Sequence, residues 1–267
     1  MIRVSLYQKE KFGVDNMTTQ EKIEETWQYC ISLYGNDRCC ALTLHGSQNY
    51  KCDTPDSDVD AKLFIAPTWR EVIEYKQPLS KTIAGPYGDI NVTDIRLFLG
   101  NNLPKQNFNF LECLFTPYSC VNHAYADLWN ELIEHREEIA HIDPAATVRT
   151  MIGQVENQYG RWGRFDKRKT LYHMMRISSA IETYQNGQCF ADTLIPNNYE
   201  HIMRVRLGKI CEEDMDFMFS LFYDHAHYCA EKVEYKGETH YASGMCLLQQ
   251  LQAQFVYRSL YELRCLE

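Results

Sequence analysis

The stretch LTLHGSQNYKCDTPDSDVDAKLFI, residues 42–65, decides the fold. It begins with an apolar run that is typical of a short buried strand, becomes polar at Gly46 and Ser47, and resumes with alternating residues from Asp58 to Ile65. Alternation of this kind is typical of a strand with one buried face. We therefore expect two strands that bracket a polar loop.

The second predicted strand carries two carboxylates on one face. Successive side chains of a strand point to opposite faces, so Asp58 and Asp60 share one face and Val59 lies on the other. Two like charges this close repel each other unless a cation lies between them. Mg²⁺ prefers a few carboxylate oxygens and completes its shell with water and substrate phosphates. The pair therefore predicts a magnesium site, with Mn²⁺ as a substitute metal.

Gly46 and Ser47 supply the complementary half of the predicted site. Glycine lets the backbone approach a ligand closely, and the serine hydroxyl and nearby N–H groups can hold phosphate oxygens. Together with the two carboxylates, these residues predict a site for a metal ion and a nucleoside triphosphate.

Two other interpretations of this loop are open. Its aspartates could form a calcium loop, but the central glycine of an EF-hand is absent and Phe64 stands where the closing glutamate would be. A solvated acidic turn without a ligand is the second alternative, since Asp, Ser and Pro are ordinary turn residues. The spacing from the Gly-Ser pair and the apolar runs on both sides favour the nucleotide site.

The same residues resemble the signature of the DNA polymerase β-like nucleotidyltransferase superfamily. In that signature Gly-Ser is followed by about ten residues and then by Asp-x-Asp at a strand, as in Gly46-Ser47 and Asp58-Val59-Asp60. The longer patterns GSxxY, from Gly46, and TPDSDVD, from Thr54, are similar to the bacterial and phage branch that is sometimes found beside RNA ligases. The resemblance implies transfer of a nucleoside monophosphate from an NTP such as ATP to a hydroxyl acceptor, with release of pyrophosphate. An RNA end is one candidate acceptor.

In this superfamily a third carboxylate arrives on a neighbouring strand. Residues 81–84 and 89–93 flank a Gly-Pro-Tyr-Gly turn and predict a strand, a turn and a second strand. We place the third catalytic and metal-binding carboxylate at Asp89, which opens the second strand. Asp94 is the alternative, although it could instead cap the helix predicted over residues 95–103. Glu112 matches a family element, Asn-x-x-x-x-Glu-x-Leu, and a catalytic and a structural role are both open for it.

From about residue 123 helical patterns dominate. We therefore predict a mixed α/β fold, with a nucleotidyltransferase domain over residues 1–122 and a helical domain over residues 123–267 that closes the cleft. In the helical part Lys169, His173 and Arg176 lie on one helical face at i, i+4 and i+7.

The family shows a similar Lys-x-x-x-His-x-x-Arg pattern, followed later by Arg-x-Gly, which is present here at Arg206 and Gly208. Lys169, His173 and Arg176 are expected to bind the nucleotide phosphates or the acceptor. A solvated basic face is the alternative.

Composition limits the classes of protein. The chain has 267 residues, 45% of them hydrophobic and 24% charged, which is ordinary for a globular protein. A net charge of -9 argues against a general nucleic-acid coat but permits a local basic groove. No apolar run could cross a membrane, no signal peptide is apparent, and the 11 cysteines include no Cys-x-x-Cys pair. We expect a cytoplasmic enzyme with reduced thiols. A catalytically silent nucleotide-binding protein and a helical interaction scaffold are the alternatives.

Overall fold

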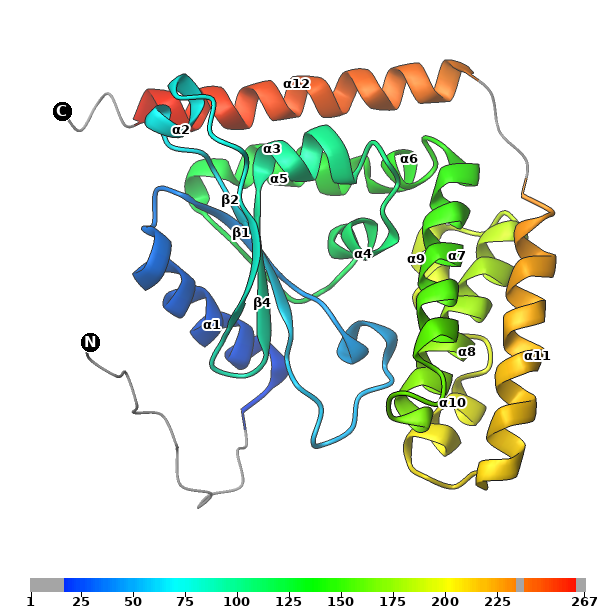
Figure 1. Cartoon of the computed structure of the whole chain (residues 1–267). Helices are drawn as coiled ribbons and strands as arrows, with labels where there is room; N and C mark the ends of the chain where they lie inside the picture. Colours follow the sequence, from blue (N-terminus) through cyan, green and yellow to red (C-terminus); the bar gives the residue numbers. More distant parts are fainter. Residues whose placement is uncertain (1–16, 234–237, 263–267) are drawn as a thin grey trace.

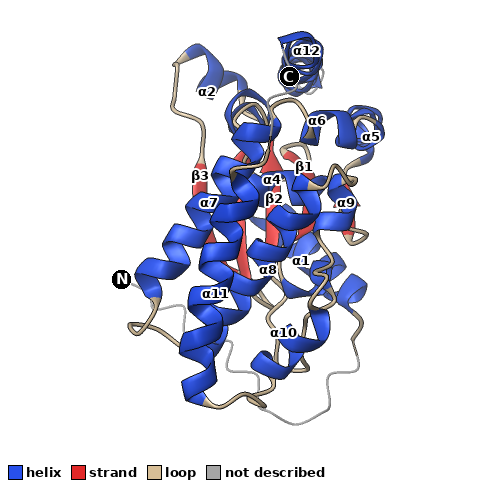
Figure 2. Ribbon diagram, turned by 90° about the vertical axis from the view of Figure 1, so that its right-hand side faces the viewer, coloured by secondary structure: helices blue, strands red, loops and turns tan. Residues whose placement is uncertain are grey.

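The computed structural model describes residues 17–233 and 238–262, and the predicted mixed α/β fold is confirmed. A five-stranded sheet lies between α1 on one side and the short helices that follow β4 on the other, as Figure 1 shows. In a view turned by 90°, helices α7, α8 and α11 form a layer in front of the sheet (Figure 2).

The sheet has the strand order β3-β4-β2-β1-β5. Strands β2 and β4 pair in parallel, and every other neighbouring pair is antiparallel. The five strands are β1 (Cys39–Leu44), β2 (Ala61–Ile65), β3 (Ser80–Ala84), β4 (Asp89–Asp94) and β5 (Ser119–Val121).

Helix α1 covers one face of the sheet. It spans Thr19–Tyr34, begins with the capping box that Thr18 and Glu21 form, and ends at Gly35, whose φ of 87° favours glycine. Its apolar side buries Ile23 and Trp27 against the strands. Because α1 covers this face and a second core covers the other, the side chains of β1 and β2 are buried on both faces.

The core on the other face continues past residue 122 into the helical half. It runs from Phe64 and Phe98 through Trp129 to Met175 without interruption. In the described residues, the α-helices after α1 are α2 (Trp69–Ile73), α3 (Ile95–Leu97), α4 (Phe108–Leu111), α5 (Ala126–Glu134), α6 (Arg136–Ala140), α7 (Pro144–Arg161), α8 (Lys167–Gln185), α9 (Phe190–Thr193), α10 (Tyr199–Arg206), α11 (Glu212–Ala230) and α12 (Glu238–Glu262).

Helix α12 returns to the first half of the chain and lies along α3 and α5 (Figure 1). Its buried residues Leu248, Leu251 and Phe255 belong to the same core. Residues before and after position 122 therefore make apolar contacts in two places, in the core that runs from Phe64 to Met175 and where α12 packs along α3 and α5. No helix in the described ranges combines the length and apolarity needed to cross a membrane.

One predicted strand is shorter than the sequence indicated, and one predicted helix changes its hydrogen-bond pattern along its length. The strand expected from Asp58 begins only at Ala61, because its partner β1 ends at Leu44 and the chain then leaves the sheet. The helix expected over 95–103 is α3 followed by a π-helical turn at Phe98–Asn102. The two carboxylates of the Asp-x-Asp motif therefore lie in the loop that leads into β2.

Candidate functional site

A cavity of about 650 Å³ lies between the loop that follows β1 and the helices α7, α8 and α10. It brings together all the predicted site residues except Asp89. The predicted residues in its lining are Gly46, Ser47, Asp58, Asp60, Lys169, His173 and Arg176. The first four come from the sheet half and the last three from α8, so residues more than a hundred positions apart form one site.

The loop after β1 is held in a conformation that favours glycine. Gly46 has a φ of 142°, which L residues rarely adopt, and Ser47 begins a 3₁₀ turn. The side-chain amide of Gln48 donates a hydrogen bond of 2.9 Å to the backbone carbonyl oxygen of Asp58. This hydrogen bond ties the Gly-Ser turn to the Asp-x-Asp segment, so the two halves of the predicted motif are held together.

Asp60 is oriented by the turn between β3 and β4. Its Oδ1 accepts a hydrogen bond of 2.8 Å from the backbone N–H of Asp89, and the N–H of Val59 donates to the carbonyl of Tyr87 at 2.9 Å. A Cβ on Gly88 would lie 2.7 Å from the carbonyl oxygen of Val59. Glycine at this position therefore permits the close approach of the turn to the Asp-x-Asp segment.

Asp89 itself is exposed and does not line the cavity. Strand alternation and the pairing of Lys62 with Asn91 place its Cβ on the same face of the sheet as that of Lys62. Its backbone, rather than its carboxylate, contacts the site residue Asp60.

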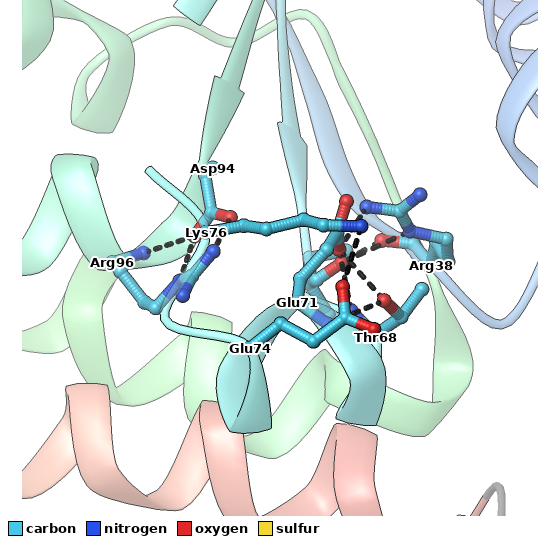
Figure 3. Close-up of polar contacts among 9 residues, drawn as sticks. Arg38, Thr68, Glu71, Glu74, Lys76, Asp94 and Arg96 are labelled. Carbon is cyan, nitrogen blue, oxygen red and sulfur yellow. Dashed lines mark hydrogen bonds and ion pairs between the residues drawn. The ribbon is translucent and has the colours of Figure 1, made fainter. Parts of the chain in front are cut away.

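The alternative third carboxylate, Asp94, has a structural role at the opposite end of β4. It pairs in register with Ile65, is 1% exposed and caps α3 by accepting from the N–H of Arg96 at 2.8 Å. Its carboxylate also binds the Arg96 guanidinium through two hydrogen bonds of 3.0 and 2.7 Å, beside the ion pair of Arg38 and Glu71 (Figure 3). Asp94 does not line the cavity, so the capping interpretation is confirmed.

The opposite wall of the cavity is strongly cationic. Asp166 is the N-cap of helix α8, and its carboxylate accepts a hydrogen bond of 3.1 Å from the backbone N–H of Lys169. Burial and the nearby charges of Arg176, Lys169, Arg161 and Arg206 lower the pKa of His173 from 6.5 to about 3. Burial is the largest cause of this shift, and the four cations that add to it place His173 in a positive electrostatic potential.

Three further cations belong to this wall, and the sequence patterns do not predict them as site residues. Arg161, Arg168 and Arg206 also line the cavity. A guanidinium nitrogen of Arg206 donates to the hydroxyl of Ser57 at 2.9 Å, and the group lies over the ring of Tyr172 at 4.6 Å. The concentration of cations around the start of α8 and the Arg-x-Gly pattern are the sequence signals for these residues.

Glu112 lies directly behind the cavity wall. It is fully buried, its two oxygens contact Nδ1 of His45 and the hydroxyl of Tyr50, and it does not line the cavity. Burial would raise its pKa, but His45, Arg176 and Tyr50 together lower the pKa to about 2. Glu112 is therefore a buried carboxylate anion.

Within the described residues, no three His, Cys, Asp or Glu side chains form a ready set of metal ligands. Asp56, Asp58 and Asp60 are the carboxylates that line the cavity from the loop before β2, and no ion pair with another described residue is seen for them. Comparison with known proteins adds no family: no family model matches the chain, and no curated protein matches it.

Proposed function

We propose that this protein is a metal-dependent nucleotidyltransferase that moves a nucleoside monophosphate from an NTP to a hydroxyl acceptor and releases pyrophosphate. The single observation that carries the proposal is the composition of the cavity. Asp58 and Asp60, with the Gly-Ser turn, face a wall of cations across one cavity. The cations of that wall are Arg161, Arg168, Lys169, Arg176 and Arg206.

The charge arrangement favours a polyanionic ligand. The chain carries a net charge of -9, yet five of its 27 cationic residues gather at the helical wall of this cavity, whose lining also contains Asp56, Asp58, Asp60 and Asp166. Like charges held together repel each other, and the repulsion is relieved when an anion binds. A triphosphate is an anion of suitable charge, and its phosphate oxygens match the planar, bidentate donors of arginine.

Asp58 and Asp60 fit Mg²⁺, because they are two unpaired carboxylates beside the place where the phosphates would lie. When bound there, Mg²⁺ supplies charge neutralisation of the phosphates and a lower pKa for the attacking hydroxyl. The chain's own residues do the positioning: the turn at Gly46 and Ser47 orients phosphate oxygens, and the α8 cations stabilise negative charge as it moves onto the leaving group. We assign the carboxylate of Asp89 to the acceptor side.

The test is an assay of transfer with each NTP. The protein is incubated with each α-labelled NTP, ATP first, in Mg²⁺ or Mn²⁺, together with RNA that carries a free 3′ hydroxyl, small hydroxyl acceptors, or no added acceptor. Label transfer and pyrophosphate release are both measured. The proposal predicts stoichiometric release of pyrophosphate with label transfer, and the double variant Asp58→Asn with Asp60→Asn serves as the inactive control.

A second candidate is a nucleotide-binding protein without transferase activity. It is favoured by one observation, the position of the Asp89 carboxylate outside the cavity lining. Such a protein would show an NTP-dependent rise in melting temperature and no pyrophosphate release. A scaffold that uses only its helices would show neither effect.

A further inference from the structure

Arg176 is a buried guanidinium without an anionic partner in direct contact. It is 5% exposed, it forms no ion pair or hydrogen bond with any described residue, and its Nε is fully buried. Burial of an unpaired charge is costly in free energy. Because Arg176 lines the cavity, its unused donors point to an anionic ligand there.

Aromatic rings hold the guanidinium in place. The central carbon of the Arg176 guanidinium lies 3.9 Å from the centre of the Tyr50 ring and 5.8 Å from that of Phe108. Contact of this kind with a desolvated arginine is attractive, because the face of the ring carries partial negative charge. It also leaves the N–H donors at the edge of the guanidinium plane free for a ligand.

The ring of Tyr50 is itself held from behind. Its hydroxyl donates to one oxygen of Glu112, and the other oxygen of Glu112 contacts His45. The side chains of Glu112, Tyr50 and Arg176 are each nine-tenths buried or more, so they have little freedom to move. The negative charge of Glu112 also attracts Arg176 across the tyrosine.

We propose that Glu112 is a positioning residue, which acts through Tyr50 to hold the guanidinium of Arg176 at the cavity wall, where Arg176 binds a phosphate group of the ligand. Glu112 contacts no ligand itself. The inference rests on the proposed function for the identity of the phosphate, which there belongs to the triphosphate. The five cations in the lining favour a phosphate chain over a single carboxylate.

A merely structural role for Glu112 makes a different prediction. In that case replacement of Glu112 weakens ligand binding by loosening the fold, whatever residue stands at position 176. If Glu112 acts through Arg176, its replacement has no further effect once Arg176 is gone. A double-mutant cycle on Glu112 and Arg176 therefore distinguishes the two roles.

The experiment measures binding of inorganic tripolyphosphate by calorimetry, without divalent metal, to the full chain and its variants. Arg176→Met keeps a long side chain over the ring and should weaken binding about 30-fold, since a charge-assisted hydrogen bond is lost. Glu112→Gln should weaken binding about tenfold in the wild-type background and by no measurable factor when it is combined with Arg176→Met. The matched control is Lys167→Ala. Lys167 lies on the same helix but binds Asp216 and Glu212 and does not line the cavity.

A second variant covers the case in which Glu112→Gln fails to fold. Tyr50→Phe keeps the ring beneath Arg176 and removes only the hydroxyl that binds Glu112, so a severalfold loss of affinity is expected in a protein with a normal melting curve. Wild-type affinity in Tyr50→Phe and Glu112→Gln overturns the inference. So does an equal effect of Glu112→Gln in both backgrounds, unchanged affinity in Arg176→Met, or no binding by the wild type. Tripolyphosphate binding without pyrophosphate release from any NTP contradicts the proposed function and leaves this inference standing.

Discussion

The backbone N–H of Asp89 and the Oδ1 of Asp60 are joined by a hydrogen bond of 2.8 Å. The bond connects the first residue of β4 to the residue that immediately precedes its parallel neighbour β2. It fixes the orientation of the Asp60 carboxylate through a backbone group, so the orientation does not depend on which side chain stands at position 89. The contributions of Asp60 and Asp89 to function can therefore be separated by substitution.

The Asp-x-Asp pair gives the most direct prediction. Asp58→Asn and Asp60→Asn should each lower the transfer rate about 10³-fold, because each removes a carboxylate that would hold Mg²⁺. Stability should change by no more than about 0.5 kcal/mol, since removal of one like charge relieves repulsion in the free protein. Steady-state rates and melting curves check both parts. Asp53→Asn, in the same loop but outside the cavity lining, is the matched control. Full activity in either site variant would rule out the metal pair.

Asp89→Asn and Asp94→Asn should have opposite effects. Asp89→Asn keeps the backbone bond to Asp60, so NTP binding should persist while kcat falls about 10²-fold if the carboxylate takes the acceptor proton. Asp94→Asn should leave kcat unchanged and lower the free energy of unfolding by about 1–3 kcal/mol, since a charge-assisted pair with Arg96 is lost. Kinetics and denaturant titration of both variants make the comparison. A normal kcat in Asp89→Asn would remove that residue from the catalytic set.

Gly88 tests how closely the β3–β4 turn must approach the site. A Cβ there would lie 2.7 Å from the carbonyl oxygen of Val59 and 2.8 Å from Oδ1 of Asp60. Gly88→Ala should therefore destabilise the protein by about 1–3 kcal/mol and lower kcat by displacing Asp60. Gly153→Ala is the control, because nothing lies within 4 Å of its Cβ position and alanine favours the helix by about 0.5–1 kcal/mol. Equal activity of the two variants would show that the turn does not position Asp60.

Local signals predicted the sheet half of the molecule well. The apolar runs on both sides of the Gly-Ser pair predicted β1 and β2. These features depend on residues within a few positions of one another, so they can be predicted from the sequence alone. The start of β2 was wrong by three residues, because strand length depends on where the partner strand ends.

The helical wall of the site depends on packing between distant segments. The helical-face pattern selected Lys169, which lines the cavity, but no local pattern predicts that Lys167 binds Asp216 of α11. That ion pair arises from the contact between α8 and α11. The same holds for Arg206, which reaches the site through its hydrogen bond to Ser57. Sequence patterns therefore identified the cationic helix but not all of its partners.

The low pKa of His173 predicts how anion binding depends on pH. Burial and four nearby cations, Arg176, Lys169, Arg161 and Arg206, hold that pKa at about 3 in the free protein, against an ordinary value of 6.5. The unfolded chain therefore binds a proton at His173 at higher pH than the folded protein does. The free energy of unfolding of the free protein should rise with pH between about 3 and 6.5, by no more than about 1.4 kcal/mol per pH unit from this residue.

A bound triphosphate should reverse part of this effect. Its negative charge offsets the four cations and raises the pKa of His173, so the complex takes up a proton that the free protein excludes. When the pH is lowered from 7.5 to 5.5, the affinity for tripolyphosphate should consequently increase more in the wild type than in His173→Gln. Protonation of the ligand itself contributes equally to both proteins, so the difference reports on His173. Calorimetry at the two pH values and NMR titration of the histidine ring signals, assigned with the same variant, provide the measurements. Identical pH dependence in the two proteins would show that no anion binds beside His173.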